Sequence, residues 1–150
     1  MASTRPRPEP YNTNLAAEFY VLSALHRLGR EATLTLGNKK AVDIVVVTGA
    51  GRALTIDVKG VAGPHDWPAD NVKIPSHDRH FLVLVSFEGR IADPARPPSV
   101  WVVPARRLRR FMRSYRVRTV ISRSAVRREG ERYRDGWDLL SARAQARAAS

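Results

Sequence analysis

Residues 42–59 read VDIVVVTGAGRALTIDVK, which contains two runs rich in β-branched residues separated by a short segment with two glycines. Such runs are typical of strands, and glycines allow the positive φ values that a tight turn needs. We therefore predict an antiparallel hairpin with strands at 42–47 and 54–58. Asp43 lies at the start of the first strand. Asp57 and Lys59 lie two residues apart on the second, so both side chains leave the same face.

A helix is predicted before this hairpin, with Thr13 or Asn14 as its N-cap and Gly29 as its C-terminal stop. At about 100° per residue, Glu18 falls inside the apolar arc of this helix rather than opposite it. The acid is therefore expected on the side of the helix that faces the core. The residues that define the arc are Leu15, Phe19, Leu22 and Leu25.

Three further apolar runs, at residues 32–36, 81–87 and 100–103, predict strands, and the last two are apolar enough to be buried on both faces. A sheet of about four or five strands results. Residues 60–75 carry turn-forming residues without periodicity and are expected to form a long loop. Its Trp67 could stack on a nucleic-acid base, although a loop tryptophan more often packs as an anchor.

After the last strand, Pro104 is well placed at the first turn of a helix that continues through Met112. This helix is amphipathic, with arginines on its outer face. An arginine-rich stretch follows at 116–134, and residues 137–140 (Trp-Asp-Leu-Leu) are apolar enough to dock the chain end on the core. We expect a disordered arm at residues 1–11, where alternate prolines prevent regular structure, one domain at 12–140 and a flexible tail at 141–150.

The charge of the chain indicates a polyanionic partner. Its 150 residues include 26 Lys and Arg against 14 Asp and Glu, a formal net charge of +12, and such an excess attracts phosphate backbones. There is no cysteine, which excludes disulfides, cysteine-ligated zinc and thiol nucleophiles and fits a reducing cytoplasm. No apolar run approaches the length of a membrane span, so a soluble cytoplasmic protein is expected.

The order of a helix glutamate, Val42-Asp43-Ile44 and Ile56-Asp57-Val58-Lys59 resembles the PD-(D/E)XK nuclease superfamily, closest to a bacterial group of small uncharacterised members. The resemblance covers residues 14–103 in pattern. It implies a restriction-endonuclease-like α-β-β-β-α-β core, with a central mixed sheet flanked by helices. One departure is that Val42 stands where the motif has proline. The replacement is chemically neutral, because only the carboxylate coordinates metal.

The resemblance implies an endonuclease that uses Mg²⁺ or Mn²⁺. Asp43, Asp57 and the carbonyl of Val58 would hold the ion by hard oxygen ligands, and Glu18 would reach it directly or through a water. Lys59 would position the attacking water and offset charge on the phosphate. The substrate is expected to be DNA. Many relatives cut both strands as dimers, so the resemblance leaves a homodimer open as a partner of this chain. The candidate nucleic-acid contacts are Lys39, Lys40, Lys73, Arg106 and Arg110.

Other interpretations of the same residues stay open. A same-face acid and lysine can be a surface pair worth about 0–1 kcal/mol, and the fold could serve as a catalytically inactive nucleic-acid-binding module or a small RNA-associated protein. His65, His77 and His80 match no zinc spacing and are expected to be surface residues.

Overall fold

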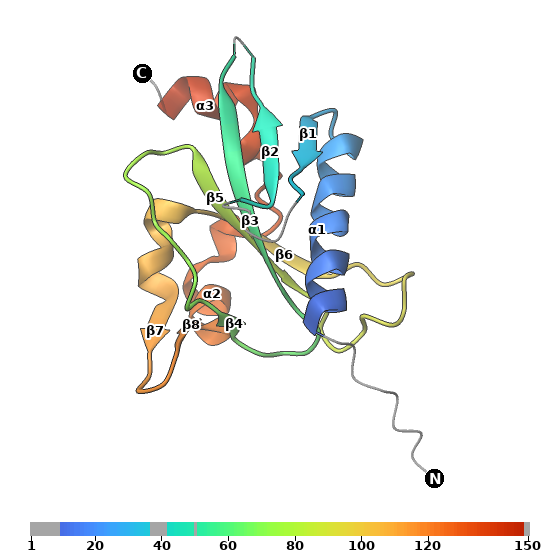
Figure 1. The fold of residues 1–150 in the computed structure, drawn as a ribbon, viewed down its shortest axis with the longest axis vertical. Coiled ribbons are helices and arrows are strands. Elements are labelled where there is room, and N and C mark those ends of the chain that lie inside the picture. Colours follow the sequence, from blue (N-terminus) through green and yellow to red (C-terminus); the bar gives the residue numbers. More distant parts are fainter. Residues whose placement is uncertain (1–9, 37–41, 50, 149–150) are drawn as a thin grey trace.

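The computed structural model describes residues 10–36, 42–49 and 51–148. A five-stranded sheet of order β1-β2-β3-β5-β6 forms its centre, and a small sheet of order β4-β8-β7 lies beside it. Figure 1 shows this arrangement. In chain order the elements are α1 (Pro10–Arg27), β1 (Glu31–Leu34), β2 (Ile44–Val47), β3 (Ala53–Val61), β4 (Trp67–Pro68), β5 (His80–Ser86), β6 (Ser99–Pro104), the 3₁₀ helix η1 (Ala105–Phe111), β7 (Met112–Ser114), β8 (Thr119–Ile121), α2 (Arg123–Glu129), η2 (Glu131–Tyr133), η3 (Trp137–Leu140) and α3 (Ala142–Ala148).

The predicted hairpin is confirmed: β2 and β3 pair antiparallel, with Ile44 opposite Ile56 and Val47 opposite Ala53. β1 pairs antiparallel with β2, and β6 with β5. β3 and β5 pair in parallel, so the sheet is mixed and the α/β fold class is confirmed. The crossover between these two parallel strands, residues 62–79, contains no helix and only the two-residue strand β4.

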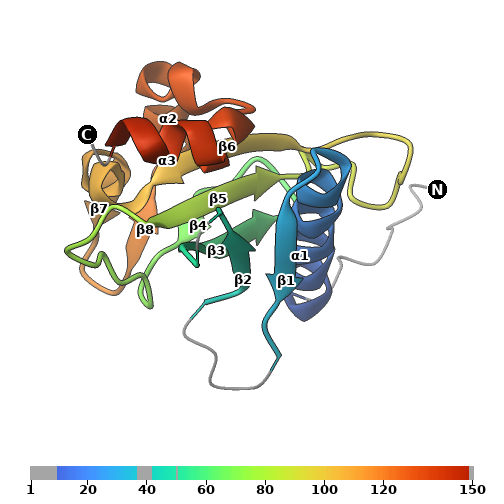
Figure 2. The same cartoon turned by 90° about the horizontal axis from the view of Figure 1, so that it is seen from above.

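The sheet is covered on both faces. α1 packs on one face and α2 on the other, as Figure 2 shows. Side chains of β3, β5 and β6 alternate between two apolar layers, because successive residues of a strand point to opposite faces. β5 is buried along its whole length, which confirms the expectation drawn from its apolar run. On the α1 side the strand residues are Leu54, Ile56, Val58, Phe81, Val83, Val85, Val100 and Val102. On the α2 side they are Val61, Leu82, Leu84, Trp101 and Val103.

Two details of α1 differ from the prediction. The helix begins at Pro10, ahead of the predicted caps, and its buried stripe contains Ala17, Val21 and Leu25, whereas Phe19 is 55% exposed. A small residue, Ala17, faces Gly60 because α1 approaches β3 closely there and a bulky side chain has no room. Glu18 is buried, as predicted, with 7% of its surface exposed.

Gly60 sets the distance between α1 and β3. A Cβ atom at residue 60 would lie 2.6 Å from the Cβ of Ala17 and 3.2 Å from the carbonyl oxygen of Thr13. We expect Gly60→Ala to lower the free energy of unfolding by about 1–3 kcal/mol, because overpacking forces the helix away from the strand. Urea denaturation measures this change.

The matched double variant removes the methyl group of residue 17 and adds one at residue 60. In the double variant Ala17→Gly with Gly60→Ala, the contact at 2.6 Å no longer exists, so the double variant should be more stable than the sum of the two single changes predicts. Strictly additive free energies would show that the two positions do not press on each other.

The residues after β6 also differ from the prediction. Residues 105–111 form a 3₁₀ helix rather than an α-helix, and Ala105, Leu108 and Phe111 are its buried residues. This three-residue spacing matches the three residues per turn of a 3₁₀ helix. Met112 belongs to β7 instead. Leu140 docks the chain end on the core, as predicted, and helix α3 occupies part of the stretch expected to be a tail.

No helix in the described ranges is both long and apolar enough to cross a lipid bilayer.

Candidate functional site

The candidate site lies where β3 extends past Ile44, the first residue of its antiparallel neighbour β2. β2 starts at Ile44, and just before it the N–H of Asp43 donates to the carbonyl of Ile56 at 2.9 Å. The N–H of Val58 then donates to Oδ2 of Asp43 at 2.7 Å. The carboxylate thus continues the ladder where the neighbouring strand has ended. Since the N–H and C=O of one strand residue point to the same side, the Val58 carbonyl also points to this open edge.

A cavity of about 510 Å³ opens at this edge. It reaches residues from both faces of the sheet because no strand covers β3 here. α1 contributes Glu18, the segment before β2 contributes Asp43, and β3 contributes Val58 and Lys59. The remaining lining residues are Thr13, Asn14, Gly60, Val61, Ala62, His65, Pro68 and Asn71.

Three of the four predicted catalytic residues therefore share one cavity. Glu18 comes from the helix on one face of the sheet, and Lys59 points to the opposite face with Val61. The close approach of α1 at Gly60 brings Glu18 to the edge of β3. Two carboxylates and one ammonium group at the opening of a cavity can bind a hard cation and, beside it, an anionic group.

Asp57, the fourth predicted residue, does not line this cavity. Its Oδ2 lies 3.4 Å from Nε2 of His80 on β5, and Nδ1 of His80 lies 2.7 Å from the Thr55 hydroxyl. Parallel pairing places His80 directly opposite Thr55. The carboxylate of Asp57 is therefore turned toward β5, away from the open edge that Asp43 occupies. His80 is buried, so the expectation of a surface histidine is wrong at this position.

The donor set of the cavity decides which metal it suits. Within the described ranges, no three His, Cys, Asp or Glu residues group together so as to hold a metal ion. A closed zinc site is thus not built here. Mg²⁺ keeps several waters and needs only one or two carboxylates besides substrate phosphate. The carboxylates of Glu18 and Asp43 with the Val58 carbonyl fit that requirement.

The predicted nucleic-acid contacts are distributed over the surface. Lys73 is exposed on the segment between β4 and β5. The Arg106 guanidinium forms an ion pair with Asp78, and that of Arg110 lies 3.7 Å from Glu129. These two arginines are partly neutralised by acids. Lys39 and Lys40 lie outside the described residues.

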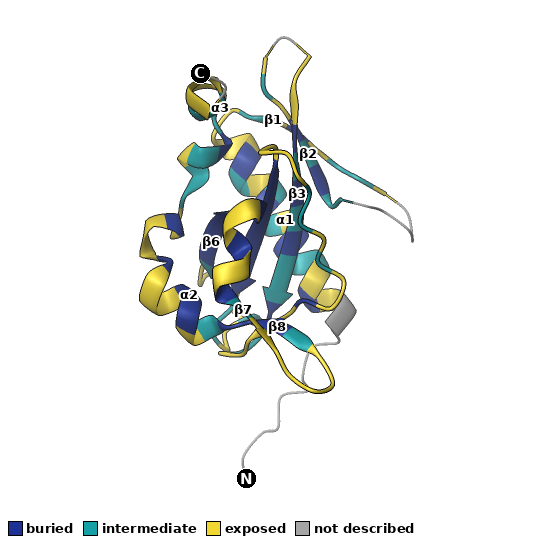
Figure 3. Ribbon diagram, turned by 90° about the vertical axis from the view of Figure 1, so that its left-hand side faces the viewer, coloured by how far each residue is buried: buried dark blue, intermediate teal, exposed yellow. Residues whose placement is uncertain are grey.

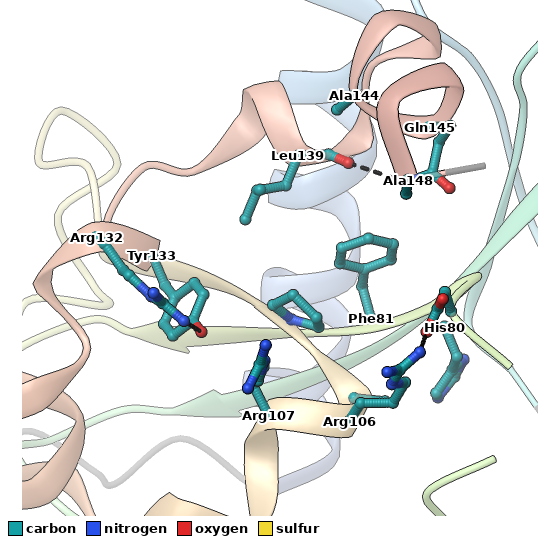
Figure 4. Close-up of a pocket in the computed structure, with 13 residues that line it drawn as sticks. His80, Phe81, Arg106, Arg107, Arg132, Tyr133, Leu139, Ala144, Gln145 and Ala148 are labelled. Atoms are coloured by element: carbon teal, nitrogen blue, oxygen red, sulfur yellow. Dashed lines mark hydrogen bonds and ion pairs between the residues drawn. The ribbon is translucent and has the colours of Figure 1, made fainter. Parts of the chain in front are cut away.

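A second cavity, of about 440 Å³, lies between η1, η2 and α3. Figure 4 shows its apolar floor, with Phe81 and Leu139, and the side chains of Arg106, Arg107 and Arg132 around it. Among the described residues that line it, Asp78 is the single acid, so it lacks the paired carboxylates of the first cavity.

Sequence reasoning missed several residues of the site. Thr13 and Asn14 line the cavity, and their position about one turn before Glu18 on the same helix could have indicated them. His65 and Asn71 come from the irregular crossover, whose path carries no periodic pattern. His80 could not be connected with Asp57 from the sequence, because their contact depends on the register between β3 and β5.

Comparisons with known proteins add information on the fold. No protein-family model matches the chain, and none of the curated proteins is similar to it in sequence. Among solved structures, the fold is similar to that of a bacterial homing endonuclease, I-Ssp6803I, with a TM-score of 0.56, 17% sequence identity and coverage of 100% of both chains. At this identity the similarity establishes a shared fold.

Proposed function

We propose that this protein is a metal-dependent endonuclease that hydrolyses phosphodiester bonds in DNA with Mg²⁺ or Mn²⁺, and that it belongs to the PD-(D/E)XK superfamily. The observation that carries the proposal is the cavity that combines Glu18, Asp43 and Lys59 at the open edge of β3. The fold shared with a homing endonuclease supports it. The net charge of +12 favours a polyanionic substrate. We also propose that the protein acts in the cytoplasm, because a chain without cysteine fits a reducing compartment.

Each cavity residue has a proposed role. Glu18, Asp43 and the carbonyl of Val58 would hold the ion. A bound Mg²⁺ or Mn²⁺ would neutralise charge on the scissile phosphate and lower the pKa of a bound water. Lys59 would donate hydrogen bonds to the phosphate and to the attacking water, orient that water and offset the negative charge that develops on the phosphate oxygens.

Asp57 is retained in the proposed catalytic set on the strength of the acid-X-lysine pattern. Its side chain is paired with His80, so a role beside Asp43 requires Asp57 to leave this partner. The pairing also supports a second candidate function. With Asp57 held by His80, the fold would be a nucleic-acid-binding module without catalytic activity.

Lys59→Ala separates these two functions. We expect the variant to lose roughly 10²-fold in the rate of Mn²⁺-dependent plasmid nicking, because one electrostatic stabiliser of the transition state is removed. DNA affinity in chelator should fall by less than about tenfold, because only one phosphate contact is lost. Rates come from gel analysis of supercoiled plasmid, with Arg27→Ala as a control on an exposed cationic side chain outside the cavity.

The test is completed by measuring both binding and nicking on three substrates: plasmid, single-stranded DNA and branched DNA. Each substrate is assayed with and without Mn²⁺. Nicking that needs Mn²⁺ and is lost in Lys59→Ala supports the enzyme. DNA binding without nicking of any substrate supports the inactive module and contradicts the enzyme.

A further inference from the structure

A short hairpin projects from the small sheet. β7 and β8 pair antiparallel, with Ser114 opposite Thr119. The N–H of Tyr115 donates to the carbonyl of Arg118 at 2.8 Å, so the loop between the strands is a tight turn. Figure 3 shows its tip as an exposed loop below the buried sheet. We call residues 112–121 the β7–β8 hairpin.

The base of the β7–β8 hairpin is fixed to the body of the protein. Ile121 is fully buried and pairs with Trp67 of β4. On the same side, Oδ1 of Asp70 accepts the N–H of Thr119 at 2.7 Å, and the N–H of Ala69 donates to the Thr119 carbonyl at 3.0 Å. With its backbone hydrogen-bonded on both sides, the hairpin is a preorganised projection.

The tip combines apolar and cationic side chains. Tyr115 is 60% exposed and Val117 88% exposed, so neither contributes much apolar burial to folding. Arg116 and Arg118 are exposed beside them, and neither side chain forms a hydrogen bond or ion pair with any described residue. By contrast, the guanidinium of Arg113 donates to the carbonyls of Arg110 and Met112. The two tip arginines thus carry positive charge that no described partner neutralises.

This combination fits duplex DNA. A two-stranded ribbon enters the major groove, which is about 12 Å wide. There, arginine binds guanine edges or phosphates, and apolar side chains contact thymine methyl groups. The exposed valine and the two arginines of the tip match these contacts in charge and in polarity.

The hairpin is also joined to the candidate site. Pro68 pairs with Val120 of β8 and lines the cavity that contains Glu18 and Asp43. Asn71, just after the residues that hold Thr119, lines it too. Figures 1 and 3 show the hairpin tip at the same end of the molecule as the start of α1. A duplex held by the tip would therefore be positioned relative to the cavity.

We infer that the β7–β8 hairpin docks in the major groove of duplex DNA through Tyr115, Arg116, Val117 and Arg118, and so presents the duplex to the cavity. This inference rests on the proposed function for its substrate and adds the surface that recognises it. The hairpin acts through binding and takes no part in the chemistry.

The test measures the binding of a fluorescent duplex to the full chain by anisotropy, in chelator, at several salt concentrations. Arg116→Ala with Arg118→Ala should raise Kd roughly 10- to 100-fold and lower the slope of log Kd against log salt by about two, one for each lost phosphate contact. Val117→Ser should weaken binding by less, and its effect should shrink on a duplex in which uracil replaces thymine. A major-groove ligand, methyl green, should compete with the protein, and the minor-groove ligand netropsin should not.

The control is Arg27→Ala with Arg52→Ala, which removes the same charge from exposed positions at the end of α1 and the start of β3. It should leave Kd within about threefold, since it removes only long-range attraction. All variants should melt within about 2 °C of the wild type, because the substituted side chains are exposed. Equal loss of affinity in hairpin and control variants would overturn the inference, as would competition by netropsin alone.

Two further outcomes separate this inference from the proposed function. If the wild type nicks DNA with Mn²⁺ and the hairpin variants bind and nick equally well, the docking inference is wrong and the nuclease stands. If no protein nicks but the hairpin variants lose duplex affinity, the docking inference stands and the nuclease is wrong. Loss of binding to phosphatidylglycerol vesicles with unchanged duplex affinity would assign the hairpin to a lipid surface and overturn the inference.

Discussion

Asp43→Asn is expected to reduce Mn²⁺-dependent cleavage by roughly 10³-fold or more, since a neutral amide is a poor ligand for a hard divalent cation and the site has few carboxylates to replace it. The same variant should preserve the fold. Its side-chain carbonyl can still accept the N–H of Val58, which now donates to Oδ2 at 2.7 Å. Plasmid nicking measures the loss of cleavage. Isothermal titration with Mn²⁺ measures the affinity for the ion, which should fall in the same variant.

Asp43→Ala is the matched variant, because it removes the acceptor as well as the charge. We expect the same loss of cleavage and, in addition, a free energy of unfolding lower by about 1–3 kcal/mol, since the Val58 N–H loses its partner. Both variants are compared with the wild type in chelator. If Asp43→Asn cleaves DNA at the wild-type rate, Asp43 does not hold the metal. If Asp43→Ala is as stable as Asp43→Asn, the bond to Val58 does not support the edge of β3.

Trp67→Ala is expected to lower the free energy of unfolding by about 3–5 kcal/mol, the usual cost of truncating a buried aromatic side chain. Trp67 is fully buried. Its indole N–H donates to the Val85 carbonyl at 3.0 Å, and its ring meets that of Trp101 edge-on, with 5.7 Å between ring centres. Urea denaturation measures the change. The burial also decides its role: Trp67 is an anchor, and stacking on a base is excluded in this conformation.

Two control variants divide this effect into parts. Trp67→Phe keeps most of the ring but leaves the Val85 carbonyl without its donor, so about 1–3 kcal/mol should be lost. Trp137→Ala, at a partly buried tryptophan, should cost less than Trp67→Ala. Because Trp67 fixes the crossover between β3 and β5, we also expect faster proteolysis within residues 62–79 in Trp67→Ala. Equal stability of the two alanine variants would contradict the anchoring role.

Patterns that depend on neighbours in sequence predicted local structure well. The hairpin of β2 and β3 follows from two β-branched runs and a glycine turn, and β5 from its continuous apolar run. The burial of Glu18 was also predicted correctly from helical periodicity. The predicted apolar arc was partly wrong, because it included Phe19 and left out Ala17 and Val21. Phe19 lies about 200° around the helix from Ala17, at about 100° per residue, and so points away from the sheet. The face of α1 that is buried is the one whose Ala17 meets Gly60, and that contact joins segments about 40 residues apart.

Predictions failed where long-range pairing decides the structure. β7 and β8 were not predicted, because three-residue strands give too short a pattern to recognise and depend on pairing with each other and with β4. Residues 105–111 were predicted as an α-helix because their apolar residues recur every three positions, a spacing that both helix types can show at this length.

The sequence by itself determined which residues could do chemistry and on which elements they lie. Alternation along a strand puts Asp57 and Lys59 on one face of β3, and this holds whatever the strand pairs with. Only the tertiary structure decided which of these groups meet. β3 extends past the first residue of β2, so Asp43 and Glu18 reach an open edge with Lys59. The parallel register with β5, in contrast, puts His80 within reach of Asp57. The physical reason is that strand ends and register are set by packing between segments far apart in the chain, which periodicity within one segment does not encode.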